Sequence, residues 1–272
     1  MQGHWTLADI PWDRFQPDKV DPEIVCAVKA AALVEHNSGD YVTYLCNVFA
    51  DDPAFCADVR QWGVEERQHG EALARWARLA DPAFDFDRAL ARFTTGYRLP
   101  LDATVSVRGS QAGELIARCV VECGTSSFYS AIRDATEEPV LKAISHRIAG
   151  DEFRHYKLFD THFRRYQPVA RLNVLTRLRI AMGRITEASD DELAMAYWCG
   201  NDLPEPYDRI RHSAAYSLRA GRVYRFGHVE RAMRMVFKAC ALNPQGWLSR
   251  FSARAAWMIF QRRNQRLSKL AA

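Results

Sequence analysis

Two short sequence words, Glu66-Arg67-Gln68-His69 and Glu152-Phe153-Arg154-His155, decide the fold of this 272-residue chain. Each has the pattern E-x-x-H, and each directly follows an acidic residue, Glu65 in the first word and Asp151 in the second. Residues three apart lie on one face of an α-helix, with Cβ atoms about 5–6 Å apart. Each word therefore predicts a helix that presents a carboxylate and an imidazole to the same neighbour.

A further glutamate precedes each word at nearly the same distance. Glu35 lies 31 residues before Glu66, and Glu122 lies 30 residues before Glu152. The chain thus contains one unit, E…E-x-x-H, written twice. Four carboxylates and two imidazoles from two such helix pairs make a site for two metal ions in a four-helix bundle. The candidate metal ligands are Glu35, Glu66, His69, Glu122, Glu152 and His155.

Every candidate ligand falls within an apolar stripe of its own predicted helix, at steps of three or four residues. A glutamate buried in such a stripe is costly unless another group neutralises it. The alternative to metal is a set of buried Glu–Arg or Glu–His pairs, which would need a separate partner for each of four glutamates. The stripes are Ile24, Val28, Ala31, Glu35, Gly39, Val42, Cys46; Val59, Gly63, Glu66, His69, Leu73, Trp76; Leu115, Cys119, Glu122, Thr125, Tyr129; and Leu141, Ile144, Ile148, Glu152, His155, Phe159.

The predicted fold class is all-α, with three parts. Residues 1–20 form an N-terminal arm anchored by Trp5, Trp12 and Phe15. Residues 21–168 form the four-helix bundle, and residues 169–272 form a basic helical extension that packs on it. The expected helices span residues 21–49, 53–81, 110–136 and 138–167, with a long connection over 84–108. In the extension they span residues 171–186, 190–199, 207–242 and 247–266.

Composition points to the cytoplasm. The first 20 residues lack the apolar core of a signal peptide, and no apolar run approaches the roughly 20 residues that span a bilayer. The seven cysteines are scattered and form no C-x-x-C, which leaves a zinc ribbon or a rubredoxin-type site without support. We therefore expect reduced thiols in a reducing compartment.

Charge is distributed unevenly. Residues 171–272 carry 18 Lys and Arg against 8 Asp and Glu, whereas residues 1–170 carry 19 against 25, which together give the net charge of +4. After Ala215, 12 basic residues face a single acid, Glu230. Such a segment suits an acidic carrier protein, an anionic membrane surface or nucleic acid, or it is a solvated helix face. The aromatic, arginine-rich segment 247–266 is expected to pack on the bundle or on a second subunit, as in a homodimer; a membrane surface is the alternative.

With these residues identified, the chain resembles the ferritin-like di-iron carboxylate proteins, and among them the soluble acyl-carrier-protein desaturases. The segment 65–73 is similar to that family's E-E-x-x-H-G-[DE]-x-L, and the segment 149–155 to its A-D-E-x-R-H, with one residue different. Glu122 is followed one turn later by Thr125, as in that family. The context of Glu35 differs from the family's, and the ligand spacing is as close to aldehyde-deformylating oxygenases. Oxygen chemistry on an acyl-type substrate is therefore better supported than desaturation itself.

The resemblance implies two iron ions, with manganese as an alternative at one or both positions. It implies Glu66 and Glu122 as bridging ligands, Glu35 and Glu152 as terminal ligands, and Thr125 as a catalytic residue beside the oxygen pocket. Asp151 and Glu65 would accept hydrogen bonds from histidine or backbone N–H groups. The expected function is an O₂-dependent di-iron oxidoreductase acting on a hydrophobic small-molecule or carrier-bound substrate. Because no flavin, nicotinamide or iron–sulfur motif is present, it needs an external redox donor such as a ferredoxin.

Four other functions remain open. The first is iron handling, with ferroxidase or peroxidase activity, as in ferritins and rubrerythrins. The second is a radical subunit of the ribonucleotide-reductase type, which places a tyrosine where this chain has Leu73; Tyr129 lies near the other glutamate instead. The third is a metal-free helical binding module in which the six residues form ion pairs. The fourth is an RNA-modifying oxygenase that uses the basic C-terminal region.

Overall fold

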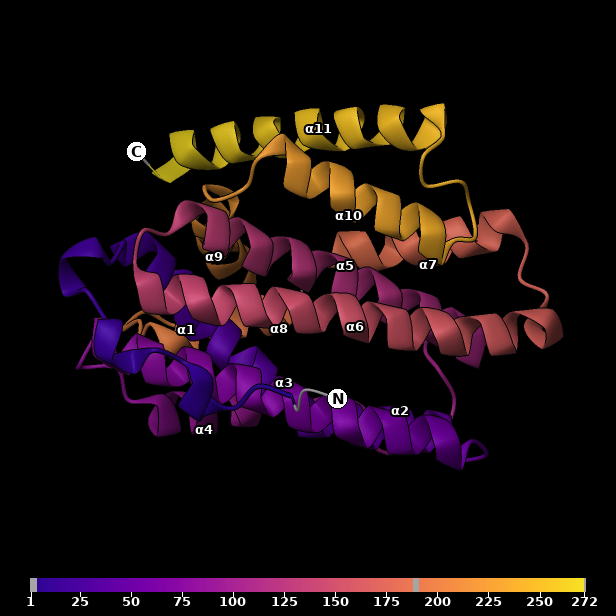
Figure 1. Cartoon of the computed structure of the whole chain (residues 1–272), viewed down its shortest axis with the longest axis horizontal. Helices are drawn as coiled ribbons and strands as arrows, with labels where there is room; N and C mark the ends of the chain where they lie inside the picture. Colours follow the sequence, from indigo (N-terminus) through magenta and orange to yellow (C-terminus); the bar gives the residue numbers. More distant parts are fainter. Residues whose placement is uncertain (1–3, 188–190, 272) are drawn as a thin grey trace.

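The computed structural model describes residues 4–187 and 191–271, and within these ranges it is all-helical, with no β-strand (Figure 1). Three short 3₁₀ turns in the N-terminal arm, at Leu7–Asp9, Trp12–Arg14 and Pro17–Lys19, precede the α-helices. The α-helices are α1 (Pro22–His36), α2 (Ser38–Val48), α3 (Pro53–Ala80), α4 (Phe86–Gly96), α5 (Gln111–Ala135), α6 (Pro139–Ala170), α7 (Val174–Glu187), α8 (Asp191–Gly200), α9 (Arg209–Gly221), α10 (Phe226–Ala239) and α11 (Trp247–Ala271).

The first expected helix, over residues 21–49, is broken at Asn37 into α1 and α2, so its prediction as one helix was wrong. The segment Asn37-Ser38-Gly39-Asp40 explains the break, because these residue types compete with the helix by local hydrogen bonding or add backbone freedom. The Asn37 side chain donates to Asp40, and the Ser38 hydroxyl donates to the carbonyl of Gly63 on α3 over 2.9 Å. The break thereby fastens the start of α2 to α3.

Two glycines on α3 let this broken helix approach closely. A Cβ atom on Gly70 would lie 2.5 Å from the backbone nitrogen of His36, and one on Gly63 would lie 2.3 Å from a methyl group of Val42. Neither site has room for a side chain. The two glycines flank Glu66 and His69 on the same helix, so the close approach brings the end of α1 up to the first E-x-x-H word.

Helix α6 runs across the middle of the molecule in Figure 1, and α3 packs against it, with α1 packed on α3 and α5 packed on α6. Helices α3 and α6 each carry an apolar cluster on either side of the E-x-x-H word. On α3, Val59 and Trp62 belong to one cluster, and Leu73 and Trp76 belong to the other. The same two clusters bracket the second word on α6. A buried polar layer therefore lies between two apolar ones, which keeps water away from it.

Other boundaries also differ from the sequence prediction: α7 begins at Val174 instead of residue 171, and α11 continues to Ala271 instead of ending at residue 266. The connection over 84–108 contains helix α4, capped by the Asp85 side chain, which accepts from the N–H of Arg88. Helix α6 continues past Pro168, which sits in its last turn and so removes only one of the final helical hydrogen bonds. The expected helix over 207–242 is interrupted after Gly221 and becomes α9 and α10.

The remaining helices pack around this core. Helix α8 lies against α1 and α4, α10 and α7 lie against α5, and α11 lies against α9 and α10. The N-terminal arm contacts both E-x-x-H helices: Gln68 on α3 donates to the carbonyl of Trp5, and Arg147 on α6 donates to that of Asp9. Within the described ranges, no helix combines the length and the apolar character needed to cross a membrane.

Candidate metal centre

The six residues singled out by the repeated motif meet in one buried cluster. They come from four helices: Glu35 from α1, Glu66 and His69 from α3, Glu122 from α5, and Glu152 and His155 from α6. None is more than 7% exposed, and His69 and Glu152 are fully buried. Four carboxylates buried so close together would repel one another, and burial deprives each of them of its solvation by water. A cation or bound protons must therefore neutralise their charge.

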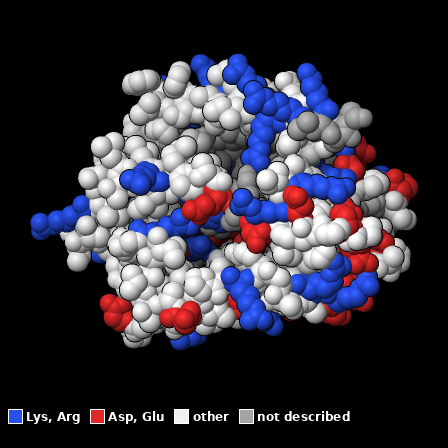
Figure 2. All heavy atoms as spheres, turned by 180° about the vertical axis from the view of Figure 1, so that it is seen from behind, with Lys and Arg blue, Asp and Glu red and all other residues white. Residues whose placement is uncertain are grey.

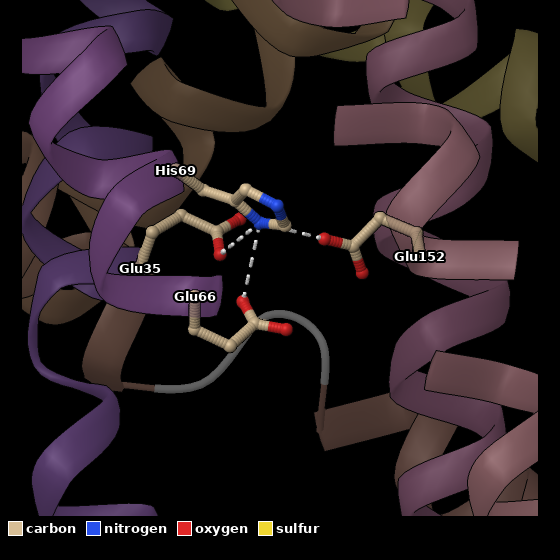
Figure 3. A group of neighbouring side chains, drawn as sticks. All are labelled: Glu35, Glu66, His69 and Glu152. Carbon is tan, nitrogen blue, oxygen red and sulfur yellow. Dashed lines mark ion pairs between the residues drawn. The ribbon is translucent and has the colours of Figure 1, made fainter. Parts of the chain in front are cut away.

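One half of the cluster is formed by Glu35, Glu66, His69 and Glu152 (Figure 3). The Nδ1 atom of His69 points toward the three carboxylates, at 3.8 Å from Glu35, 3.7 Å from Glu66 and 3.3 Å from Glu152. One donor atom from each of the four residues can be chosen so that all lie within 4.8 Å of one another. That spacing leaves room for one metal ion at their centre.

The other half is formed by Glu66, Glu122, Glu152 and His155, again with donor atoms within 4.8 Å of one another. Here the Nδ1 atom of His155 lies 2.9 Å from Glu66 and 3.9 Å from Glu122. Glu66 and Glu152 belong to both halves. Glu122 belongs to one half only, whereas the resemblance implied Glu66 and Glu122 as bridging ligands. Which carboxylates bridge two bound ions stays a prediction, and the grouping of the side chains favours Glu66 and Glu152. The two halves are equivalent, because each E-x-x-H word supplies its glutamate to both and its histidine to one.

The outer nitrogen of each histidine is held by the acid that precedes the opposite word. The Nε2 atom of His69 donates to Asp151 over 2.9 Å, and the Nε2 atom of His155 donates to Glu65 over 3.0 Å. A hydrogen bond of this kind fixes the ring orientation and the tautomer. With the proton on Nε2, each ring turns an Nδ1 lone pair toward the cluster, as a metal ligand requires.

Several inward-facing atoms have no hydrogen-bond partner among the described residues. They are Nδ1 of His69, Nδ1 of His155, one oxygen of Glu122 and one oxygen of Glu152. Buried polar atoms are almost always hydrogen-bonded in folded proteins, so four such atoms around one point call for an explanation. A pair of metal ions would supply the missing partners. The donor set fits, since carboxylate and imidazole ligands together suit iron or manganese.

Protonation balances the charge when no metal is bound. Burial raises the pKa of Glu35 and of Glu122 well above the usual value, and neighbouring glutamates raise both further. Burial alone would lower the pKa of a histidine, but the Asp151 carboxylate bonded to Nε2 and the carboxylates facing Nδ1 outweigh it and raise the pKa of His69. Glu65 and Glu66 raise the pKa of His155 in the same way, to about 10. The metal-free centre therefore holds several protons that metal binding would displace.

Two hydroxyl groups on α5 touch the cluster. Thr125, which the sequence singled out, donates to Glu152 over 2.5 Å, and Tyr129, one turn further on, donates to Glu35 over 2.5 Å. The Tyr129 ring is buried, so its hydroxyl fixes one oxygen of Glu35 and leaves the other to face the cluster. The apolar stripe contained Tyr129, but its bond to Glu35 was not predicted, because it depends on how α5 packs on α1.

The N-terminal arm completes the surroundings of His69. The Trp5 ring is stacked on the His69 ring at a centroid distance of 5.9 Å, and its indole N–H donates to Asp151 over 2.7 Å. His4 contacts the same oxygen of Asp151 at 2.9 Å. Trp5 was predicted only as an anchor of the arm. Its contact with His69 could not be predicted from sequence periodicity, because no regular helix or strand runs through the arm.

His4, Glu65 and Asp151 form a third group with metal-ligand spacing, partly exposed at the edge of the main cluster. Arg154 lies on the same two carboxylates, at 2.5 Å from Asp151 and 3.1 Å from Glu65. Arg154 is one of the variable positions of the second E-x-x-H word. It places a permanent positive charge beside this outer group.

Comparison with protein-family models finds no match for this chain, and comparison with curated protein sequences finds none either. What the structure establishes is a helical protein with two overlapping groups of buried Glu and His residues that could hold metal ions.

Proposed function

We propose that this protein is a ferritin-like, O₂-dependent di-iron oxidoreductase. The observation that carries the proposal is the division of six buried residues into two four-residue groups that share Glu66 and Glu152. Two shared carboxylates, with one further carboxylate and one imidazole in each half, suit a pair of neighbouring ions better than one ion or none. The resemblance of the two motif segments to di-iron carboxylate proteins points to the same chemistry.

Bound iron ions would supply the redox chemistry that reduces O₂ in paired electron steps. The residues of the chain have other tasks. Asp151 and Glu65 orient the two imidazoles, and the apolar clusters on either side of the centre exclude water. The hydroxyl of Thr125 holds a proton at the outer oxygen of Glu152, where it can be passed to a group reacting beside that carboxylate.

The substrate proposal rests on the resemblance. A hydrophobic molecule, free or carried as an acyl group, is the substrate class that it implies. Two surface pockets, one lined by Arg133 and Lys142 and the other by Lys29 and Arg88, contain neither a candidate ligand nor Thr125. Neither pocket is therefore assigned to the substrate. The electrons would come from an external donor protein, as expected from the sequence.

One observation favours a second candidate function, iron handling of the ferroxidase or peroxidase type. The outer group of His4, Glu65 and Asp151 adjoins the main cluster and reaches the surface, which would suit the passage of metal ions. The Arg154 guanidinium beside two of these residues weakens a cation site there. We therefore rank this function second.

Oxygen uptake separates the two candidates. Protein loaded anaerobically with ferrous iron is mixed with O₂, with and without a chemical reductant and a panel of fatty acyl thioesters. The proposed oxidoreductase consumes O₂ through repeated turnovers when donor and substrate are present, and a modified acyl chain appears. An iron-handling protein consumes O₂ in proportion to added ferrous iron and accumulates ferric mineral. Uptake no faster than that of the Glu66→Ala variant would contradict both.

A further inference from the structure

Helix α11 is apolar on two opposite faces, but its own chain covers only one of them. On the inner face Ser249 and Ala253 are fully buried, and Phe260 packs edge-on against Tyr224 with ring centroids 5.3 Å apart. The outer face is exposed and carries large apolar side chains. They are Trp247 (74% exposed), Leu248, Phe251 (65%), Met258 and Ile259 (66%). Exposed apolar residues gathered on one helix face mark an interaction site.

The outer face is also strongly basic. Helix α11 contains no Asp or Glu, and its basic residues besides Arg263, which donates to Ser217 on α9, are Arg250, Arg254, Arg262, Arg266 and Lys269. The helix lies along one edge of the molecule, over α9 and α10 (Figure 1). Seen from behind, this edge shows basic and uncharged residues and no acidic ones (Figure 2). An occupant of this face has to be negatively charged as well as apolar.

A second copy of the chain fits this requirement poorly. A two-fold interface brings the same patch of both subunits together, so arginines of one α11 would meet arginines of the other without an acidic partner on either helix. An anionic bilayer supplies both missing properties. Its headgroups pair with the arginines, and its acyl boundary takes up the aromatic and aliphatic side chains.

We propose that α11 docks this protein on an anionic lipid surface, with the helix axis parallel to the bilayer plane. A helix of 25 residues is about 37 Å long, which lets Trp247 near its start and the arginines near its end touch the surface together. The aromatic and aliphatic side chains of the outer face enter the headgroup region, and the helix does not cross the bilayer. The docking involves none of the candidate metal ligands, so it holds or fails independently of the proposed function.

Co-sedimentation with vesicles tests the docking. The full chain is mixed with vesicles of pure phosphatidylcholine, or of phosphatidylcholine with a third phosphatidylserine, at low and high salt. We expect binding to the anionic vesicles only, and weaker binding as salt rises. The Arg254→Gln/Arg262→Gln variant removes two exposed charges and should bind about 25-fold more weakly, since one basic residue near such a surface contributes about five-fold.

The apolar contribution is tested with a matched pair of double variants. Trp247→Ser/Phe251→Ser removes two side chains of the outer face and should bind at least about ten-fold more weakly. The control Val64→Ser/Val105→Ser removes two side chains of similar exposure outside α11, one of them on α3 at the opposite side of the molecule (Figure 1). The control should bind like the unchanged chain. All four side chains are exposed, and circular dichroism should show the same helix content in both variants.

Three results would overturn the proposal. The first is equal binding to neutral and anionic vesicles, or to neither. The second is unchanged binding by Trp247→Ser/Phe251→Ser. The third is a dimer in sedimentation equilibrium that dissociates in the same variant but not in the control, which would make the outer face of α11 a subunit interface.

Discussion

The Nε2 atom of His69 lies 2.9 Å from the Oδ2 atom of Asp151, although the two residues belong to different E-x-x-H helices. The reciprocal bond, from His155 to Glu65, measures 3.0 Å. Each half of the repeated motif thus orients the histidine of the other half. Asp151 and Glu65 thus belong to the centre, although they contact the outer side of the histidines and not the cluster itself. Removing either acid should weaken metal binding in the half that contains its histidine more than in the other half.

Asp151→Asn should weaken metal binding at the His69 half about 10–100-fold, because the imidazole loses the carboxylate that fixes its orientation. Ferrous iron titrated against a competing chelator would measure the change. The control is Glu71→Gln, an exposed carboxylate on α3, the helix that carries His69, and it should bind metal like the unchanged chain. An Asp151→Asn variant with unchanged affinity would mean that Trp5 and the surrounding packing orient the ring without the acid.

Metal binding should release protons, and metal affinity should rise with pH. The folded-state pKa of His155, about 10, lies above its ordinary value of 6.5. Its charged form therefore stabilises the metal-free fold fully below about pH 6.5, and this contribution is lost as the pH rises through 10. A metal ion needs the neutral ring, so loading at pH 7 displaces this proton and that of His69.

Titration calorimetry in buffers of different ionisation enthalpy counts the released protons. We expect about two protons per chain or more, because the pKa values of Glu35 and Glu122 are also raised and their carboxyl groups can lose protons too. The His69→Ala variant should release fewer. Binding heats that do not depend on the buffer would contradict the charge balance described for the metal-free centre.

Thr125→Val should leave metal content unchanged and slow O₂ consumption, by about 100-fold if the hydroxyl acts in proton transfer. Valine has nearly the same shape as threonine but cannot donate to Glu152. Oxygen uptake by iron-loaded protein provides the measurement, and Thr125→Ser provides the control, because it keeps the hydroxyl. If Val and Ser variants consumed O₂ at the same rate, the Thr125 hydroxyl would have no part in the reaction.

Gly70→Ala should destabilise the metal-free chain by about 1–3 kcal/mol, because the added Cβ would lie 2.5 Å from the backbone of His36. Urea unfolding would measure the loss. Gly124→Ala is the matched control: this glycine is also helical, but nothing lies within 4 Å of a Cβ built there. The control should gain about 0.5–1 kcal/mol from the higher helix propensity of alanine. A similar effect of both substitutions would show that α1 and α3 can move apart freely.

The sequence predicted the features that depend on local periodicity. The apolar stripes on α3 and α6 contain Glu66 and Glu152 at positions that the structure buries, and the repeat of the motif indicated that all six residues would meet. It also predicted that Asp151 and Glu65 would accept hydrogen bonds from histidine or backbone N–H groups, and the structure shows the histidine bonds. These inferences need only helical spacing and the cost of an unpaired buried carboxylate.

Features set by packing between distant segments were missed. Which carboxylates belong to both groups depends on how α3 faces α6, so the resemblance pointed to Glu122, whereas the structure has Glu152 in both groups. The contact of Trp5 with His69 joins an irregular arm to a helix. The break at Asn37, unlike these two features, could have been predicted, because the run Asn-Ser-Gly-Asp is typical of a turn. The apolar stripe that continues through this run favoured a single helix instead.

The most direct test of the two-metal centre is the metal content of three proteins reconstituted anaerobically with ferrous iron. The unchanged chain should hold about two irons. Glu35→Ala removes a ligand of one half only and should keep about one, whereas Glu66→Ala removes a ligand of both halves and should keep almost none. One iron or none in the unchanged chain, or equal retention by the two variants, would contradict a centre built on two shared carboxylates, and the six residues would then have to be explained as buried ion pairs.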